Sequence, residues 1–235
     1  MCQNLLNLRP KQNPICLTFV LNGGIIASTN LKNYNLAKPI KFNRGCLRSE
    51  IMLVLISGCS GSGKNTIIKA LMERNSNIRF LKSCTTRKPR PNEDNYIHIS
   101  KEEFDEKLKN NEIFEYEEIH QNFYGTLNSS LQEVVECHEK GIHFAKDIGV
   151  LGQINMARAL KGKTPVLSIF LTVPKAELIR RLEARGEKQI DLRLSRMEFE
   201  LGYVDNFDVV IRNVNIDKTV ARIEKLIAKF AYRQI

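Results

Sequence analysis

Short, predominantly apolar runs alternate with longer polar stretches along most of this chain. From residue 52 onward the length of these runs is typical of buried strands, and they fall at 52–56, 78–82, 113–119, 142–145, 166–173 and 208–211. Between them, apolar residues spaced three or four apart predict a helix at 217–230. A capping box from Ser100 to Glu103 predicts the start of another helix, which runs to about residue 110. Strands that alternate with helices predict an α/β fold, with a mostly parallel sheet covered by helices on both faces.

The first fifty residues differ from the rest of the chain. They contain eight asparagines and a single acid, Glu50, and they show no sustained helical or alternating periodicity. We predict that residues 1–51 are an extension outside the folded domain, either disordered or the product of a mis-assigned start, with Met52 as the true first residue. An organellar transit peptide and a secretory signal around the apolar stretch 15–21 are the alternatives.

The net charge of +10 is concentrated in that extension. Residues 1–50 carry +6, which leaves +4 for the rest of the chain. That modest excess suits a site for polyphosphates and requires no nucleic-acid surface. No run of eighteen apolar residues occurs, so we expect no membrane span. The six cysteines lack paired or metal-ligand spacing, which indicates reduced thiols and a cytoplasmic location.

A glycine-rich segment, GCSGSGKNT at residues 58–66, follows the first predicted strand and precedes a helix. This is the context of a phosphate-binding P-loop. The glycines allow a tight turn whose backbone N–H groups point at phosphate oxygens, and the helix dipole adds positive charge. Lys64 then reaches the β- and γ-phosphates. The residues predicted to bind a nucleoside triphosphate are Gly58, Ser60, Gly61, Ser62, Gly63, Lys64, Asn65 and Thr66.

The residue after the P-loop lysine is normally Ser or Thr, whose hydroxyl binds Mg²⁺, but here it is Asn65. An amide oxygen also coordinates hard cations, although the side chain is longer and oriented differently. Asp147 lies at the carboxyl end of a predicted strand, where P-loop enzymes place a Mg²⁺-associated aspartate. Asn65 and Asp147 are therefore the candidate ligands of a perturbed magnesium site.

A second basic segment, SCTTRKPRP, occupies residues 83–91. Arg87 and Arg90, framed by hydroxyls and prolines, form a stiff basic loop suited to a phosphate monoester. A solvated basic turn is the alternative interpretation of this segment alone.

Taken in order, these segments resemble the guanylate kinase family across residues 52–235. The segments in family order are the P-loop, 83–90, the Glu115 strand, Tyr124-Gly125-Thr126, Asp147-Ile148, and Arg185-Gly186 through Arg193-Leu194. The resemblance implies a P-loop three-layer fold with an inserted GMP-binding subdomain at residues 83–130 and a lid at 183–197. It also implies an enzyme that phosphorylates GMP, and dGMP, with ATP and Mg²⁺, as a monomer or homodimer.

The resemblance also implies roles for single residues. The GMP phosphate would be held by Arg87, Arg90, Tyr96 and Tyr124. Guanine would be read by Ser83, Glu115 and Thr126, because one carboxylate accepts both N1–H and N2–H while a hydroxyl donates to O6. Asn213 would lie near the adenine of ATP, and the lid would contribute Arg185 and Arg193 to the ATP phosphates. The residues expected to act in catalysis are Lys64, Arg87, Asp147, Arg185 and Arg193.

The chain departs from the family pattern at several places. Gly149 stands where the family commonly has the second aspartate of Asp-Ile-Asp, and the stretches 93–96 and 186–190 are shorter than in the family. Two other functions stay open. A ribose bisphosphate phosphokinase on the same fold would lack the acid at Glu115, and a catalytically weak binding module would not need Lys64 or the arginines.

Overall fold

The computed structural model describes residues 17–21, 24–29, 53–90, 93–137, 142–161 and 164–232. The chain divides into two units, residues 1–36 and 37–235. In the first unit, β1 (Leu17–Leu21) pairs with β2 (Gly24–Thr29) as an antiparallel hairpin. The sequence pattern did not predict this hairpin. The prediction for residues 1–51 falls largely outside the described residues and stays a prediction.

The second unit is built on a five-stranded sheet with the order β11-β10-β3-β9-β4, in which every pair is parallel. Its strands are β3 (Leu53–Gly58), β4 (Ile78–Phe80), β9 (His143–Asp147), β10 (Val166–Thr172) and β11 (Val209–Arg212). The predicted parallel sheet is therefore confirmed. Since Ile56 is in register with Asp147, the start of the P-loop and the predicted metal ligand lie at the same edge of the sheet.

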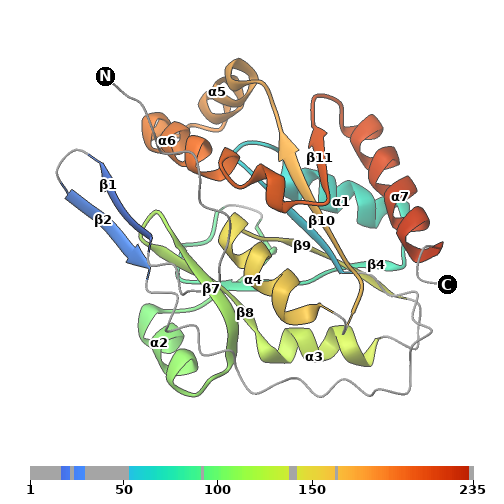
Figure 1. Ribbon diagram of the computed structural model, residues 1–235, viewed down its shortest axis with the longest axis horizontal. Helices are drawn as coiled ribbons and strands as arrows, with labels where there is room; N and C mark the ends of the chain where they lie inside the picture. Colours follow the sequence, from blue (N-terminus) through green and yellow to red (C-terminus); the bar gives the residue numbers. More distant parts are fainter. Residues whose placement is uncertain are drawn as a thin grey trace, which may run out of the picture. The chain divides into compact units, whose positions relative to one another are not determined.

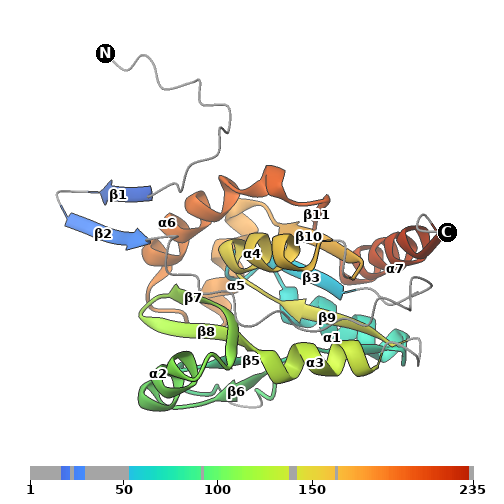
Figure 2. The same cartoon turned by 60° about the horizontal axis from the view of Figure 1, so that its bottom comes forward.

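Helices cover both faces of this sheet (Figures 1 and 2). On one face α1 (Lys64–Arg74) and α7 (Ile216–Tyr232) pack against Val54 and Ile56. On the other face α3 (Asn128–Glu136) and α4 (Val150–Leu160) pack against Leu53 and Leu55. Alternate residues of β3 thus enter opposite cores, which is why the strand reads as a continuous apolar run.

A smaller four-stranded sheet has the order β6-β5-β8-β7. Its strands are β5 (Ser83–Thr85), β6 (Tyr96–His98), β7 (Ile113–Ile119) and β8 (Asn122–Leu127). Helix α2 (Lys101–Lys109) covers it through the fully buried Phe104, whose ring stacks on that of Phe123. Ser100 caps α2 by accepting a hydrogen bond from the N–H of Glu103 at 3.1 Å, as the sequence predicted.

Two further helices, α5 (Lys175–Ala184) and α6 (Ile190–Leu201), are followed by the short helix η3 (Val204–Asn206). Their apolar side chains share a core with Phe170 of β10. The predicted lid, residues 183–197, spans the end of α5, the connecting loop and most of α6. None of the described helices is long and apolar enough to cross a membrane. The three described cysteines, Cys59, Cys84 and Cys137, are buried and free.

Candidate active site

One cavity of about 830 Å³ brings the predicted site residues together. The P-loop, the small sheet, the end of β9 and the helices α5 and α6 all contribute to its lining. Every predicted site residue lines this cavity except Ser62 and Thr126, which are fully buried. Segments that are far apart in the sequence therefore meet at one place.

The P-loop has the backbone that its glycine spacing predicted. Gly58, Gly61 and Gly63 all have positive φ, at 143°, 88° and 91°, a region that side chains other than hydrogen rarely allow. A Cβ at Gly58 would also clash with the carbonyl oxygen of Leu171 on β10. The N–H of Ser62 donates to the carbonyl of Cys59 at 2.9 Å, which closes the turn ahead of α1. The loop therefore presents its amides at a helix N-terminus, where anions bind.

Lys64 is folded back over the P-loop. Its Nζ donates to the carbonyl oxygen of Gly58 at 2.6 Å and lies 4.0 Å from Oδ1 of Asp147. The ammonium group thus stands between the loop and the end of β9, where it can neutralise phosphate charge.

The two candidate magnesium ligands fit a hard cation. The Oδ1 atom of Asn65 is buried without a hydrogen-bond partner among the described residues. Asp147 accepts a hydrogen bond from the hydroxyl of Tyr96 at 2.9 Å through Oδ2. Burial and the negative charge of Asp147 raise the pKa of Tyr96, so the phenol stays protonated and donates. Mg²⁺ commonly takes one or two protein oxygens and keeps several waters, which is what this pair could provide.

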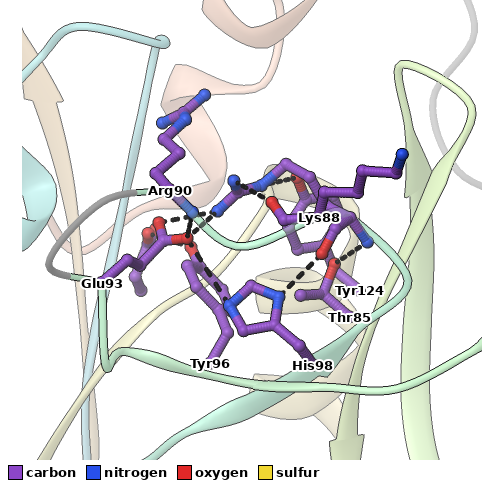
Figure 3. Close-up of polar contacts among 9 residues, drawn as sticks. Thr85, Lys88, Arg90, Glu93, Tyr96, His98 and Tyr124 are labelled. Atoms are coloured by element: carbon purple, nitrogen blue, oxygen red, sulfur yellow. Dashed lines mark hydrogen bonds and ion pairs between the residues drawn. The ribbon is translucent and has the colours of Figure 1, made fainter.

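At the other end of the cavity, Arg87 is held by polar side chains that include Glu93 and Tyr124, both labelled in Figure 3. Its Nη2 donates to both carboxylate oxygens of Glu93 at 2.7 Å, and its Nε donates to the hydroxyl of Tyr124 at 3.1 Å. Burial alone would lower the pKa of Arg87, but the hydrogen bonds and charge of Glu93 outweigh it and raise the pKa. The guanidinium is therefore permanently charged and fixed in orientation.

Arg90 is the freer of the two arginines in this cluster. Its backbone N–H donates to Glu93 at 3.2 Å, while its side chain extends away from that carboxylate in Figure 3. His98 supports the cluster from β6, since its Nδ1 lies 2.7 Å from the carbonyl oxygen of Arg87. Sequence reasoning gave no role to Glu93 or His98, because only the folded loop brings them to Arg87.

The predicted base-reading groups are buried together. Glu115 is 5% exposed, and its Oε1 accepts a hydrogen bond from the hydroxyl of Thr126 at 2.5 Å. A fully buried lysine, Lys146, donates to the hydroxyl of Ser83 at 2.6 Å. Burial raises the pKa of Glu115, and the charge of Lys146 opposes that rise. Sequence reasoning missed Lys146 because it directly follows the apolar run 142–145, at the end of what reads as an ordinary strand.

The predicted lid arginines reach the same cavity. Arg185 donates to the hydroxyl of Ser60 in the P-loop at 2.9 Å, and Arg193 pairs with Glu187 at 3.0 Å. Burial and the positive charges of Arg90 and Arg193 lower the pKa of Arg185. Arg90, Arg185 and Arg193 therefore line the cavity close enough together to repel one another, an arrangement that a bound polyanion would stabilise.

Asn213 anchors the P-loop in this structure. Its Nδ2 donates to the carbonyl of Ser62 at 2.8 Å, and its Oδ1 accepts from the hydroxyl of Thr219 at 3.0 Å. The carbonyl oxygen of Asn213 accepts from Arg181, a cavity-lining residue that the sequence did not single out. A contact of Asn213 with adenine stays a prediction.

This fold, with a P-loop and a second arginine cluster around one cavity, is typical of a P-loop kinase. Comparison with known proteins narrows the class. The sequence profile of the family described as guanylate kinase matches residues 50–230. A guanylate kinase of Prochlorococcus marinus subsp. pastoris is 40% identical over 183 residues, which cover 74% of this chain and 96% of that protein. A guanylate kinase of Chlorobaculum tepidum is 36% identical over 185 residues, covering 76% and 92%.

The solved structures agree with the sequence comparison. The crystal structure of guanylate kinase from Anaplasma phagocytophilum superposes with a TM-score of 0.61 at 28% identity, covering 77% of this chain and 86% of that one. The chain belongs to the guanylate kinase family. The predicted family and fold class are therefore confirmed.

Proposed function

We propose that this protein transfers the γ-phosphoryl group of ATP to GMP, giving ADP and GDP. The observation that carries the proposal is that one cavity has an anion-binding loop at one end and the Arg87 cluster at the other. The buried carboxylate of Glu115 supplies the third element, a reader for the base. Membership in the guanylate kinase family supports the same enzyme class.

Catalysis in this site rests on positioning and charge neutralisation, because phosphoryl transfer leaves little covalent work for the protein. The P-loop amides and Lys64 hold the donor phosphates. Arg87, Arg90, Tyr96 and Tyr124 hold the acceptor phosphate, and Arg185 and Arg193 of the lid neutralise the charge between the two nucleotides. Lid closure would exclude water, which suppresses hydrolysis of ATP.

Asn65 and Asp147 are the residues that would hold Mg²⁺. When bound, the ion neutralises charge on the β- and γ-phosphates. Tyr96 orients Asp147 from the acceptor side through its 2.9 Å hydrogen bond.

Guanine is selected by the acceptors and donors around Glu115. Its carboxylate accepts N1–H and N2–H, while the hydroxyl of Ser83 donates to O6 because that hydroxyl already accepts from Lys146. Adenine offers no pair of N–H donors on this edge, so it would leave a buried carboxylate oxygen without a partner. Such a mismatch is penalised more strongly than a missing apolar contact.

The two alternative functions are not favoured. A ribose bisphosphate phosphokinase has no base to read and therefore no use for Glu115 buried against Thr126. A binding module has no use for the folded-back Lys64 or for the arginines that converge on the cavity. The cytoplasmic location, the monomeric or homodimeric state and the use of dGMP stay predictions.

A coupled assay of ADP release by the full chain tests the proposal, with ATP against GMP, dGMP, AMP, IMP and ribose 1,5-bisphosphate. We expect GMP to give the highest kcat/KM, with AMP at least about tenfold lower, a difference of about 1.4 kcal/mol. A highest rate with ribose 1,5-bisphosphate, or no transfer to any acceptor, would contradict the proposal.

A further inference from the structure

A carboxylate on β7 occupies the space next to Gly149. Glu115 and Glu117 are both buried, whereas the next residue, Glu118, is exposed. Because side chains alternate between the two faces of a strand, the two buried acids share one face of β7, which is the face toward the cavity. A Cβ added at Gly149 would clash with Oε2 of Glu117 and lie 2.9 Å from its Cδ. The absence of a side chain at 149 is therefore what allows Glu117 to lie there.

The lid helix holds one oxygen of this carboxylate. Arg196 of α6 donates from Nη2 to Oε1 of Glu117 and from Nε to Oε1 of Glu200 at 3.2 Å. Its guanidinium also lies over the ring of Phe199, 4.5 Å from the centroid. This ion pair is a direct link between the small sheet and the lid helix.

The other oxygen of Glu117, Oε2, is buried and has no hydrogen-bond partner among the residues that the structure describes. The side chain is 7% exposed and lines the cavity. A buried charged acceptor is costly to leave unsatisfied, so this oxygen is suited to a donor on a bound ligand.

The strand register places Glu117 along the path of the acceptor nucleotide. Glu115 is paired with Thr126, at the base-reading end, and Glu117 is paired with Tyr124, at the phosphate end. If a nucleotide binds between those two ends, its guanosine part lies next to Glu117. A carboxylate repels phosphate but accepts N–H and O–H donors, and guanosine carries both kinds.

We propose that Glu117 is a specificity-determining residue, whose free oxygen accepts a hydrogen bond from the guanosine part of GMP while Arg196 holds the other oxygen from the lid. The donor is either the 2-amino group of guanine or the 2′-hydroxyl of ribose. This inference rests on the proposed function and adds a residue to its acceptor site. Because Glu117 and a side chain at 149 exclude each other, the same acidic position can be supplied from β7 or from the end of β9, but not from both.

The experiment uses the full chain with Glu117→Gln and the matched control Glu118→Gln on the exposed face. In Glu117→Gln the amide oxygen faces Arg196, so an NH₂ group meets the ligand donor. We expect KM for GMP to rise at least about tenfold, with kcat and KM for ATP changed less than about threefold. The GMP preference over IMP shrinks if the donor is the amino group, and the preference over dGMP shrinks if it is the 2′-hydroxyl. Glu118→Gln keeps wild-type values.

A second set of variants tests the exclusion between positions 117 and 149. Gly149→Asp alone should raise KM for GMP, whereas Gly149→Asp combined with Glu117→Ala should recover most of the loss. Melting temperatures identify any variant that fails to fold, and Glu117→Gln, which keeps the shape of the side chain, remains decisive in that case. The role is overturned if Glu117→Gln leaves KM and both preferences unchanged, or if Gly149→Asp alone behaves as the wild type. A wild type that does not phosphorylate GMP would instead overturn the proposed function, and this role with it.

Discussion

The two ends of the cavity are built to bind phosphate by different means. At the donor end the P-loop folds its backbone around three glycines with positive φ, and Lys64 is its one charged side chain. At the acceptor end the charged side chains come from separate strands and loops, as in the pairing of Arg87 with Glu93 and the burial of Lys146 beside Ser83. One end is a backbone site and the other is a side-chain site.

This difference affects how each end tolerates change in sequence. A backbone site depends on glycines at fixed spacing, because only they allow both the turn and the close approach of phosphate. A side-chain site depends on where a charge is delivered and not on which strand delivers it. The clash of a side chain at Gly149 with Glu117 means that one position in the cavity can be filled either from β7 or from the turn after β9, but not from both.

The largest effect is expected at the donor end. Lys64→Ala should lower kcat with GMP by about 10³-fold, or about 4 kcal/mol, because it removes charge stabilisation at the transferred phosphoryl group. The melting temperature should change by only a few degrees, since the side chain is not part of the apolar core. Steady-state kinetics and thermal melts measure both. Near-wild-type activity would contradict the assignment of the donor end.

The backbone site is also the part that the sequence predicts best. The glycine spacing at 58–63 predicts its conformation, and the apolar runs predict the sheet that carries it. The contact of Arg196 with Glu117 joins residues 79 positions apart, and nothing local in the sequence links them. Lys146 likewise reads as a strand residue until the register of β9 is known. Long-range side-chain contacts therefore had to come from the structure.

A smaller effect is expected from the base reader at the acceptor end. Glu115→Gln replaces one acceptor of the carboxylate with an NH₂ donor, so a guanine N–H would face another N–H. We expect the preference for GMP over AMP to shrink at least about tenfold, or about 1.4 kcal/mol, with little change in KM for ATP. The ratio of the two kcat/KM values measures it. An unchanged ratio would mean that the base binds elsewhere in the cavity.

Lys146→Met tests whether the buried cation keeps that reader ionised. Burial raises the pKa of Glu115, and the charge of Lys146 opposes it, so the pKa should rise further when the cation is removed. Glu115 must be deprotonated to accept two N–H groups. The acid limb of the pH profile of kcat/KM for GMP should therefore move to higher pH, with activity lost earlier as the pH falls. The acid limb of kcat/KM for ATP, measured at saturating GMP, should move much less.

A control for that shift is available on the same strand. His143→Gln changes a half-buried position at the start of β9, three residues before Lys146, and should leave the acid limb in place. An unshifted acid limb in Lys146→Met would show that the charge of Lys146 is not what keeps Glu115 deprotonated. The acceptor end would then depend less on charges delivered from distant parts of the sequence than the comparison of the two ends implies.

The smallest effect is expected at the donor end, where Asn65 stands in place of the usual Ser or Thr. Asn65 presents a buried Oδ1 atom without a partner among the described residues, so the site offers an oxygen to Mg²⁺ even without a hydroxyl. Asn65→Ser should supply a more compact ligand at the distance of about 2.1 Å that Mg²⁺ requires. We expect the Mg²⁺ concentration for half-maximal rate to fall a few-fold and kcat to rise by a similar factor. Glu73→Gln, at an exposed position of the same helix that does not line the cavity, should change neither value. A variant that needs more Mg²⁺ than the wild type would show that the amide is the better ligand here, and that the donor end has adapted a side chain as well as its backbone.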